Sequence, residues 1–507
     1  MRIKRIFGIL IIAVFFLNGC YKPGPGAKPW KVSGLDNSDT QYESNTTDTS
    51  DVMNYPMDQP ILTTPTPNVP ITLPTPRSST LTYSVQQGDT LRIIGQKYQV
   101  SVNQIVLTNN LNNPNLIEIG QVLLIPPPVL ENSAPRFKII PDSELVYSLS
   151  NAAFDVERFV KDKNGYLASY TEVVDGFSSS GTDIVERVAL ENSVNPRLLL
   201  TILEYQSQWV TKASPDEETL NYPMRYYDAW YEGLYAQLGW AANLLNEGYY
   251  LWKINAITVW ILTDGSVIQV DPTINPGTAG VINLMRYLND ETTWEKAIAD
   301  EGIFDTYIRF FGYPFNYAIE PMIPDNITQP VLQLPFEAGV VWSFTGGPHG
   351  GWNTGSAWAA LDFAPPGGAL GCSPSEAWVT ASAPGEIVYS DHGAVIEDLD
   401  GDGIWQTGWS ILYMHIDSNE RIEVGQVVDT GDRIGHPSCE GGVSTGSHLH
   451  IARRYNGEWI AADSDVPMIM DGWKAVGYGV EYNGYLVNGD KTVEAWDGQT
   501  TLNAIKR

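Results

Sequence analysis

The pair His448 and His450 constrains this chain more than any other sequence feature. The two histidines are separated by one residue in the segment STGSHLHI, residues 444–451. Successive side chains along a β-strand point to opposite faces, so residues two apart share a face. A strand here would hold both imidazole rings side by side, as a metal site requires. The tripeptide alone also fits an ordinary strand with two surface histidines.

Three more residues have side chains that can bind a metal ion or take part in catalysis. The chain has only six histidines, and His349 and His415 can be grouped with this pair and with Asp362. His349, Asp362 and His450 would supply two nitrogens and a carboxylate oxygen to Zn²⁺, leaving the fourth tetrahedral position to water. His415 and His448 would flank that water. One would take its proton, and the other would hydrogen-bond the oxyanion formed when an amide carbonyl is attacked.

Residues 409–459 resemble the core of the lysostaphin-type zinc endopeptidases of bacterial cell walls. The blocks LYMHI (412–416), VGQVVDTGDRIG (424–435) and STGSHLH (444–450) follow the order found in that family. The resemblance implies a compact, mostly antiparallel β domain with zinc in a groove between loops. Short runs at 386–389, 410–416 and 448–451 contain β-branched or aromatic residues and agree with this fold.

The family resemblance also assigns roles to residues. It makes His349, Asp362 and His450 the ligands of one Zn²⁺ per chain, and it makes His415 and His448 the catalytic histidines. His349 and Asp362 are 13 residues apart, whereas the commoner family pattern has a spacing of four. The long spacer resembles the staphylolysin or β-lytic branch.

Other residues in this region have less specific patterns. His392 and His436 lie in turn-like sequence, and we expect no catalytic role for either. Cys372 and Cys439 would be able to oxidise in an exported domain, as one disulfide, or remain two independent thiols.

The segment DLDGDG, residues 398–403, begins like a calcium-binding loop, with Asp398, Asp400 and Asp402 as the ligands. An EF-hand also needs an acid at loop position twelve, which here is Trp409, and a helix on each side. We therefore expect a loop between two strands. It would bind a structural Ca²⁺ or form an acidic solvated turn.

The N-terminus reads as an export signal. A basic start, an apolar run at 6–17 and the residues NGC at 18–20 fit a signal peptide. The run is too short to favour a permanent transmembrane helix. Resemblance to bacterial lipoproteins implies cleavage before Cys20 and lipidation of that residue, so we expect an exported protein held at the cell envelope by a lipid anchor in the membrane. The alternative is a cysteine that stands at this boundary by chance.

Residues 83–126 resemble a LysM module, which opens with YSVQQGDTL and closes with IEIGQVLLIP. The resemblance implies a small βααβ unit that binds glycans containing N-acetylglucosamine, and hence peptidoglycan. The implied glycan groove is formed by Gly88, Asp89, Thr90, Leu91 and the loop that runs from Asn109 to Pro114.

The net charge of the chain, −29, argues against nucleic acid as a partner and against a polybasic membrane patch.

The region between the LysM module and the peptidase domain reads mainly helical, with apolar residues at helical spacing and a helix start at Asn195-Pro196. Residues 197–208 faintly resemble the catalytic helix of lysozyme-like transglycosylases. Glu204 lies two residues from the position of the glutamate in that family, about 200° around a helix, and cannot simply replace it. The region is a spacer, a glycan-binding domain or a glycan-cleaving one.

The sequence thus predicts a multidomain chain: a small βααβ LysM module, a mostly α-helical middle domain and a C-terminal antiparallel β zinc-peptidase domain. The function expected is a peptidoglycan hydrolase that LysM targets to the wall. Alternatives are a non-enzymatic wall-binding regulator of other hydrolases and a protease that acts on proteins. The predicted segments are a signal peptide (1–20), a disordered linker rich in Pro, Thr and Ser (21–80), LysM (81–128), the helical domain (141–330) and the peptidase domain (331–507).

Overall fold

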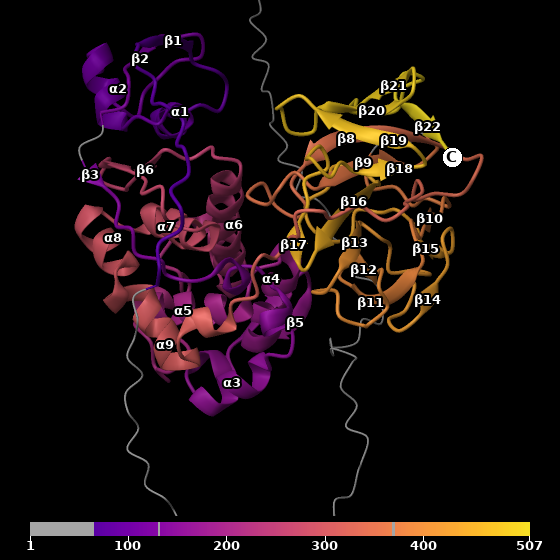
Figure 1. The fold of residues 1–507 in the computed structure, drawn as a ribbon, viewed down its shortest axis with the longest axis horizontal. Coiled ribbons are helices and arrows are strands. Elements are labelled where there is room, and N and C mark those ends of the chain that lie inside the picture. Colours follow the sequence, from indigo (N-terminus) through magenta and orange to yellow (C-terminus); the bar gives the residue numbers. More distant parts are fainter. Residues whose placement is uncertain (1–64, 130–131, 368–370) are drawn as a thin grey trace, which may run out of the picture.

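The structure is a computed structural model that describes residues 65–129, 132–367 and 371–507. The predicted signal peptide, Cys20 and most of the predicted linker lie outside these residues. Figure 1 shows a small indigo unit, a helical body in magenta and a β-rich body in orange and yellow. Within the described ranges, no helix combines the length and apolar character needed to cross a membrane. This layout confirms the predicted fold class, while the predicted domain limits stay predictions.

The LysM unit folds as predicted, with two helices between two antiparallel strands. Its elements are β1 (Leu81–Ser84), α1 (Leu91–Tyr98), α2 (Val102–Asn109) and β2 (Val122–Ile125). Thr90 caps α1, where its Oγ1 accepts a hydrogen bond from the Ile93 backbone N–H at 3.2 Å. The side chain of α1 residue Gln96 donates to the Tyr287 hydroxyl at 3.1 Å, so the unit lies against the helical body.

The helical body contains the helices that the apolar spacing predicts. The Asn195 side chain accepts from the Arg197 backbone N–H at 2.8 Å and Pro196 opens the helix, which confirms the predicted start. Short strands that we did not predict complete the body. The elements are β3 (Asn132–Ser133), α3 (Val156–Lys163), β4 (Thr171–Val174), β5 (Phe177–Ser180), α4 (Gly181–Asn192), α5 (Pro196–Ser207), α6 (Leu234–Lys253), β6 (Val259–Ile261), β7 (Val267–Gln269), α7 (Pro276–Leu288), α8 (Glu291–Ile298) and α9 (Asp305–Phe311).

The β-rich body is built on one antiparallel sheet with the order β14-β11-β12-β13-β16-β9-β8-β22, and β17 pairs with β16. Beside it stand the sheet β18-β19-β20-β21 and the pair β10-β15. The bounds are β8 (Val341–His349), β9 (Ala360–Ala364), β10 (Val379–Thr380), β11 (Gly385–Asp391), β12 (Ala394–Asp398), β13 (Trp409–Met414), β14 (Val427–Val428), β15 (Arg433–Gly435), β16 (Leu449–Tyr455), β17 (Glu458–Trp459), β18 (Ile469–Met470), β19 (Trp473–Gly477), β20 (Gly484–Asn488), β21 (Lys491–Glu494) and β22 (Ala504–Lys506).

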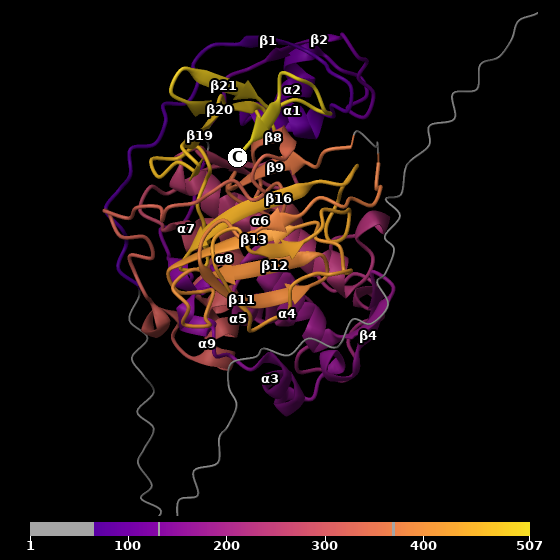
Figure 2. The ribbon, with the colours of Figure 1, turned by 90° about the vertical axis from the view of Figure 1, so that its right-hand side faces the viewer.

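Both faces of the large sheet are buried. Ile411 of β13 packs into a core with the smaller sheet, whereas its neighbour Leu412 belongs to the core of the helical body. Val395 and Ile396 of β12 divide in the same way. Figure 2 looks onto the strands, with the helices behind them. The helical body and the sheet therefore share one continuous apolar core.

A buried arginine lies at the centre of this shared face. The guanidinium of Arg454 is 3.9 Å from the ring centroid of Trp459 and 4.6 Å from that of Trp405. It also donates to the Leu190 carbonyl at the end of α4, at 3.2 Å. Burial lowers the pKa of Arg454 to about 9. Stacking and one hydrogen bond thus hold this cation between the two bodies.

The 13-residue spacer between His349 and Asp362 makes further contacts with the helical body. The Gly355 backbone N–H donates to Asn243 Oδ1 of α6 at 2.7 Å, and Asn353 Nδ2 donates to Asn192 Oδ1 of α4 at 2.9 Å. The insertion that marks the β-lytic branch is therefore a domain contact.

Cys372 and Cys439 form a disulfide in the structure. The bond closes a loop of 67 residues and ties the segment after β9 to the segment before β16. Of the two alternatives that the sequence left open, the structure has the bonded one.

The spacer contact leads to a stability prediction. A Cβ at Gly355 would overlap the Asn243 carbonyl, whereas a Cβ at Gly239 in α6 meets no atom within 4 Å. Gly355→Ala should lower the free energy of unfolding by about 1–3 kcal/mol. Gly239→Ala, the matched control, should raise it by about 0.5–1 kcal/mol, because alanine favours a helix interior. Chemical denaturation of the full chain, followed by tryptophan fluorescence, measures both. Equal stabilities would contradict the spacer contact.

Candidate metal centre

Sheet register brings the predicted ligands together. His450 of β16 pairs directly with Asp362 of β9. The strand neighbours of His450, Leu449 and Ile451, point into the core on the opposite face of the sheet. His450 therefore points toward the helical body. His349 ends β8 after an irregularity in the register between Gly346 and His349. Three strands thus deliver one donor each to the same face.

The three potential donor atoms lie within 3.2 Å of one another. His349 Nε2 is 3.0 Å from His450 Nδ1 and 3.2 Å from Asp362 Oδ1, and His450 Nδ1 is 3.1 Å from the same oxygen. All three residues are buried. Tetrahedral Zn²⁺ with bonds of about 2.0–2.2 Å needs donors roughly 3.3–3.6 Å apart. A slight opening of the triangle would fit this ion.

Backbone carbonyls fix which nitrogen of each ring faces the centre. His349 Nδ1 is 2.8 Å from the Gly347 carbonyl, and His450 Nε2 is 3.0 Å from the Gly351 carbonyl. A carbonyl oxygen only accepts, so these nitrogens carry the hydrogens. His349 Nε2 and His450 Nδ1 therefore direct their lone pairs at one shared point, the arrangement that a cation requires.

The two predicted catalytic histidines lie beside this cluster. The rings of His415 and His448 are 4.4 Å apart, and His448 Nε2 is 3.7 Å from Asp362 Oδ1. His415 Nδ1 donates to the Glu440 carbonyl at 3.0 Å, and His448 Nδ1 donates to the Gly446 carbonyl at 2.8 Å. Each ring therefore uses Nδ1 for this anchoring hydrogen bond and leaves Nε2 available for chemistry.

Burial and neighbouring charge act in opposite directions on this cluster. Burial alone would lower the pKa of His349, but the charge of Asp362 and its hydrogen bond outweigh it and raise that pKa. Burial lowers the pKa of His415 well below its ordinary value, and His448 and His450 lower it further. Burial also lowers the pKa of His450. Burial alone would raise the pKa of Asp362, but His349 and His448 outweigh it and hold that pKa well below its usual range. The centre thus has an ionised carboxylate beside two histidines, His415 and His450, whose lowered pKa values favour the neutral ring.

Sequence reasoning missed two residues at this centre. The ring of Tyr482 stacks on His349, with centroids 4.2 Å apart and an interplanar angle of 21°. Burial, with Asp362 and Glu481 nearby, raises the pKa of Tyr482 to about 12, so its hydroxyl stays protonated. Glu440 contributes through its backbone carbonyl. Neither belongs to a recognisable motif, so no sequence signal pointed to them.

The remaining predicted residues lie elsewhere. His392 lies at a turn between β11 and β12, and the ring of His436 packs at a tilt against that of Trp378, with centroids 3.9 Å apart. Neither belongs to the metal cluster. Asp398, Asp400 and Asp402 form a second carboxylate cluster, in a loop that joins two strands as predicted. Glu204 accepts hydrogen bonds from the backbone N–H and the hydroxyl of Thr211, at 3.2 and 2.6 Å. Its carboxylate thus ties α5 to the following turn.

The predicted glycan-binding residues mostly stabilise the LysM fold. Asp89 accepts from the Tyr83 hydroxyl and the Gln86 backbone N–H, both at 2.7 Å, and Leu91 is buried. The Asn109 side chain donates to the Leu124 carbonyl and accepts from the Leu124 N–H, also at 2.7 Å. Gly88 has a φ of +88° and open space around it. The polar side chains of Asp89 and Asn109 are therefore engaged in hydrogen bonds within the LysM fold.

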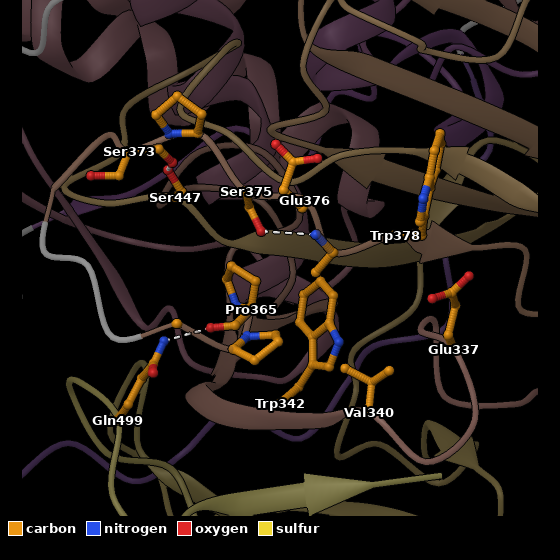
Figure 3. A pocket seen from close by; sticks show the side chains of 14 residues that line it. Glu337, Val340, Trp342, Pro365, Ser373, Ser375, Glu376, Trp378, Ser447 and Gln499 are labelled. Atoms are coloured by element: carbon orange, nitrogen blue, oxygen red, sulfur yellow. Dashed lines mark hydrogen bonds between the residues drawn. The ribbon is translucent and has the colours of Figure 1, made fainter.

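Ser447, the residue before His448, is one of the residues that line a hollow of about 470 Å³ (Figure 3). Trp342, Trp378, Glu337 and Glu376 are among the residues that line it. The Gln499 side chain donates to the Pro365 carbonyl at 2.6 Å along its wall. The hollow is aromatic and acidic.

Comparisons with known proteins agree with this geometry. Residues 361–462 match peptidase family M23, residues 83–126 match the LysM domain and residues 138–324 match the LasA N-terminal domain. Protease LasA of Pseudomonas aeruginosa (strain UCBPP-PA14) is 24% identical over 352 residues, which cover 63% of this chain and 74% of that protein. The beta-lytic metalloendopeptidase of Lysobacter enzymogenes is 32% identical over 139 residues, covering 25% of this chain and 71% of that protein.

A solved structure of the M23 metalloprotease pseudoalterin, from the deep sea, is 23% identical and covers 34% of this chain and 99% of that one, with a TM-score of 0.28. That score is too low to support a structural conclusion. The sequence matches confirm the resemblances to the lysostaphin-type peptidases and to LysM. The chain therefore belongs to peptidase family M23, and a LysM domain and a LasA N-terminal domain precede its peptidase domain.

Proposed function

We propose that this protein is a zinc-dependent endopeptidase that hydrolyses peptide bonds in the stems or cross-bridges of peptidoglycan. The observation that carries the proposal is the meeting of His349 Nε2, His450 Nδ1 and Asp362 Oδ1, where two lone pairs and one carboxylate oxygen converge within 3.2 Å. These residues would hold one Zn²⁺. When bound, Zn²⁺ lowers the pKa of a coordinated water and polarises the scissile carbonyl.

The chain's own residues would handle the proton and the oxyanion. His415 is neutral because burial lowers its pKa, so its Nε2 can accept a proton from water. His448 lies on the exposed side of the pair, and its side chain is 18% accessible. Its Nε2 would hydrogen-bond the oxyanion, and the proton that His415 takes from water would pass to the leaving amine. The Glu440 and Gly446 carbonyls hold both rings in the required orientation.

His450→Ala should abolish both zinc binding and hydrolysis. Loss of even an outer-shell partner costs metalloenzymes about 10–100-fold, so loss of a ligand should cost at least about 100-fold. Metal analysis of the purified full chain and release of new amino groups from peptidoglycan measure the two effects. His392→Ala, outside the cluster, is the matched control and should keep both properties.

Two outcomes separate this proposal from its rivals. Stoichiometric zinc with no release of amino groups, in a protein that still binds the wall, would favour the non-enzymatic regulator. Faster cleavage of a glycine-rich protein than of peptidoglycan would favour a protease that acts on proteins.

We also propose that the LysM domain holds the enzyme on N-acetylglucosamine-containing glycan. The loop after α2 includes exposed Asn112, and the LysM resemblance makes this loop one wall of the groove and the loop of Gly88 the other. Binding would raise the local concentration of peptide bonds near the zinc centre.

Asn112→Ala should weaken binding of an N-acetylglucosamine oligomer by about 2–10-fold, the worth of one hydrogen bond. Asn103→Ala, also exposed but at the opposite end of α2, should have no effect. Titration calorimetry with the full chain measures the change. Equal affinities would argue against this groove.

The predicted export and lipid anchor belong to the same proposal, because an anchored enzyme would act on wall within reach of the membrane. Cys20→Ser should abolish incorporation of a labelled fatty acid and release the protein from the membrane fraction. Cys439→Ser, which leaves Cys20 intact, should incorporate the label normally. A labelled Cys20→Ser protein would rule out this anchor.

A further inference from the structure

A second group of metal-ligand residues lies in the loop between β12 and β13. Asp398, Asp400 and Asp402 each bring a carboxylate oxygen to within 4.8 Å of the others. Asp398 and Ala394 stand at opposite ends of β12, and Ala394 pairs with Met414, the β13 neighbour of His450. Four residues of strand span about 13 Å, so this cluster is separate from the metal centre.

Asp398 is the informative member of the group. It is completely buried, and its Oδ1 accepts no hydrogen bond from any of the described residues. Its other oxygen accepts from the Gly403 backbone N–H at 3.0 Å. A buried carboxylate oxygen without a partner is costly, and two further carboxylates beside it add repulsion. A cation at this point would compensate both effects.

The donor set selects the kind of cation. All three side chains offer oxygen only, which suits a hard ion and not zinc or copper. Asp400 and Asp402 are exposed, and Asp400 lines an open hollow of about 430 Å³. Water can therefore reach the cluster and complete a coordination shell of six to eight oxygens, as Ca²⁺ prefers.

The same loop is part of the contact between the two bodies. Trp405 is buried, and its ring packs edge-on against that of Tyr147 of the helical body, with centroids 5.2 Å apart. At the end of the loop, the Trp409 indole N–H donates to the Thr328 carbonyl in the connector between the bodies, at 3.1 Å. The conformation of the loop thus determines how the helical body is held.

We propose that Asp398, Asp400 and Asp402 bind one Ca²⁺, and that the ion fixes the loop that holds Trp405 against the helical body. The ion acts as a structural clamp between the domains and takes no part in hydrolysis. The full chain should then gain stability from Ca²⁺ while its zinc content is constant.

Terbium luminescence excited through tryptophan tests the site, because Tb³⁺ replaces Ca²⁺ and Trp405 and Trp409 flank the cluster. The full chain, saturated with zinc, should show one saturable terbium site from which Ca²⁺ displaces the ion. Asp400→Asn should weaken that site by about tenfold, because calcium affinity follows the number of charged ligands. Asp432→Asn, an exposed aspartate of the turn before β15, is the matched control and should bind as the wild type does.

Thermal unfolding tests the clamp. Ca²⁺ should raise the unfolding midpoint of the wild type and of Asp432→Asn, and at the same Ca²⁺ concentration it should raise that of Asp400→Asn by less. Absence of a saturable terbium site, or equal affinity in Asp400→Asn, would overturn the site. Displacement by Mg²⁺ at the same concentration as by Ca²⁺ would overturn the choice of ion. Terbium binding without any thermal shift would overturn the clamp.

Discussion

The metal centre depends on one register, the antiparallel pairing that places Asp362 of β9 opposite His450 of β16. A slip of one residue would exchange the two faces of a strand and send a ligand into the apolar core with Leu361 and Ile451. The hydrophobic pattern of both strands prevents this slip. The residues that pack the core therefore also determine where the proposed zinc ligands point.

The helical body supports that centre from outside the peptidase sheet. α4 and α6 hold the spacer that follows His349, and within this spacer the Gly351 carbonyl accepts the hydrogen of His450 Nε2. The tautomer of His450, a proposed zinc ligand, thus depends on a loop that a different domain holds in place. The match to the LasA N-terminal domain covers the residues that supply this support.

Strand alternation paired His448 with His450 in the sequence, and the family resemblance supplied His349, Asp362 and His415. The structure brings these five residues together, and their chemical roles stay predictions. The contacts with the helical body could not be predicted in the same way. Arg454 is buried between Trp459, five residues further along, and Trp405, 49 residues before it, and no motif indicates this pairing. Tyr482 joins the centre through a turn 32 residues after His450, with no pattern of its own.

The apolar face that the sheet shares with the helical body limits how the peptidase domain can be separated from the rest of the chain. Ile396, Leu412 and Ala452 form part of the core of the helical body, although they lie on strands of the peptidase domain. A peptidase fragment that begins at the connector would expose these side chains to water as an apolar patch prone to aggregation. The two domains are therefore not interchangeable parts. Recombination that moves the catalytic sheet into another protein must carry its helical partner along or provide a substitute cover.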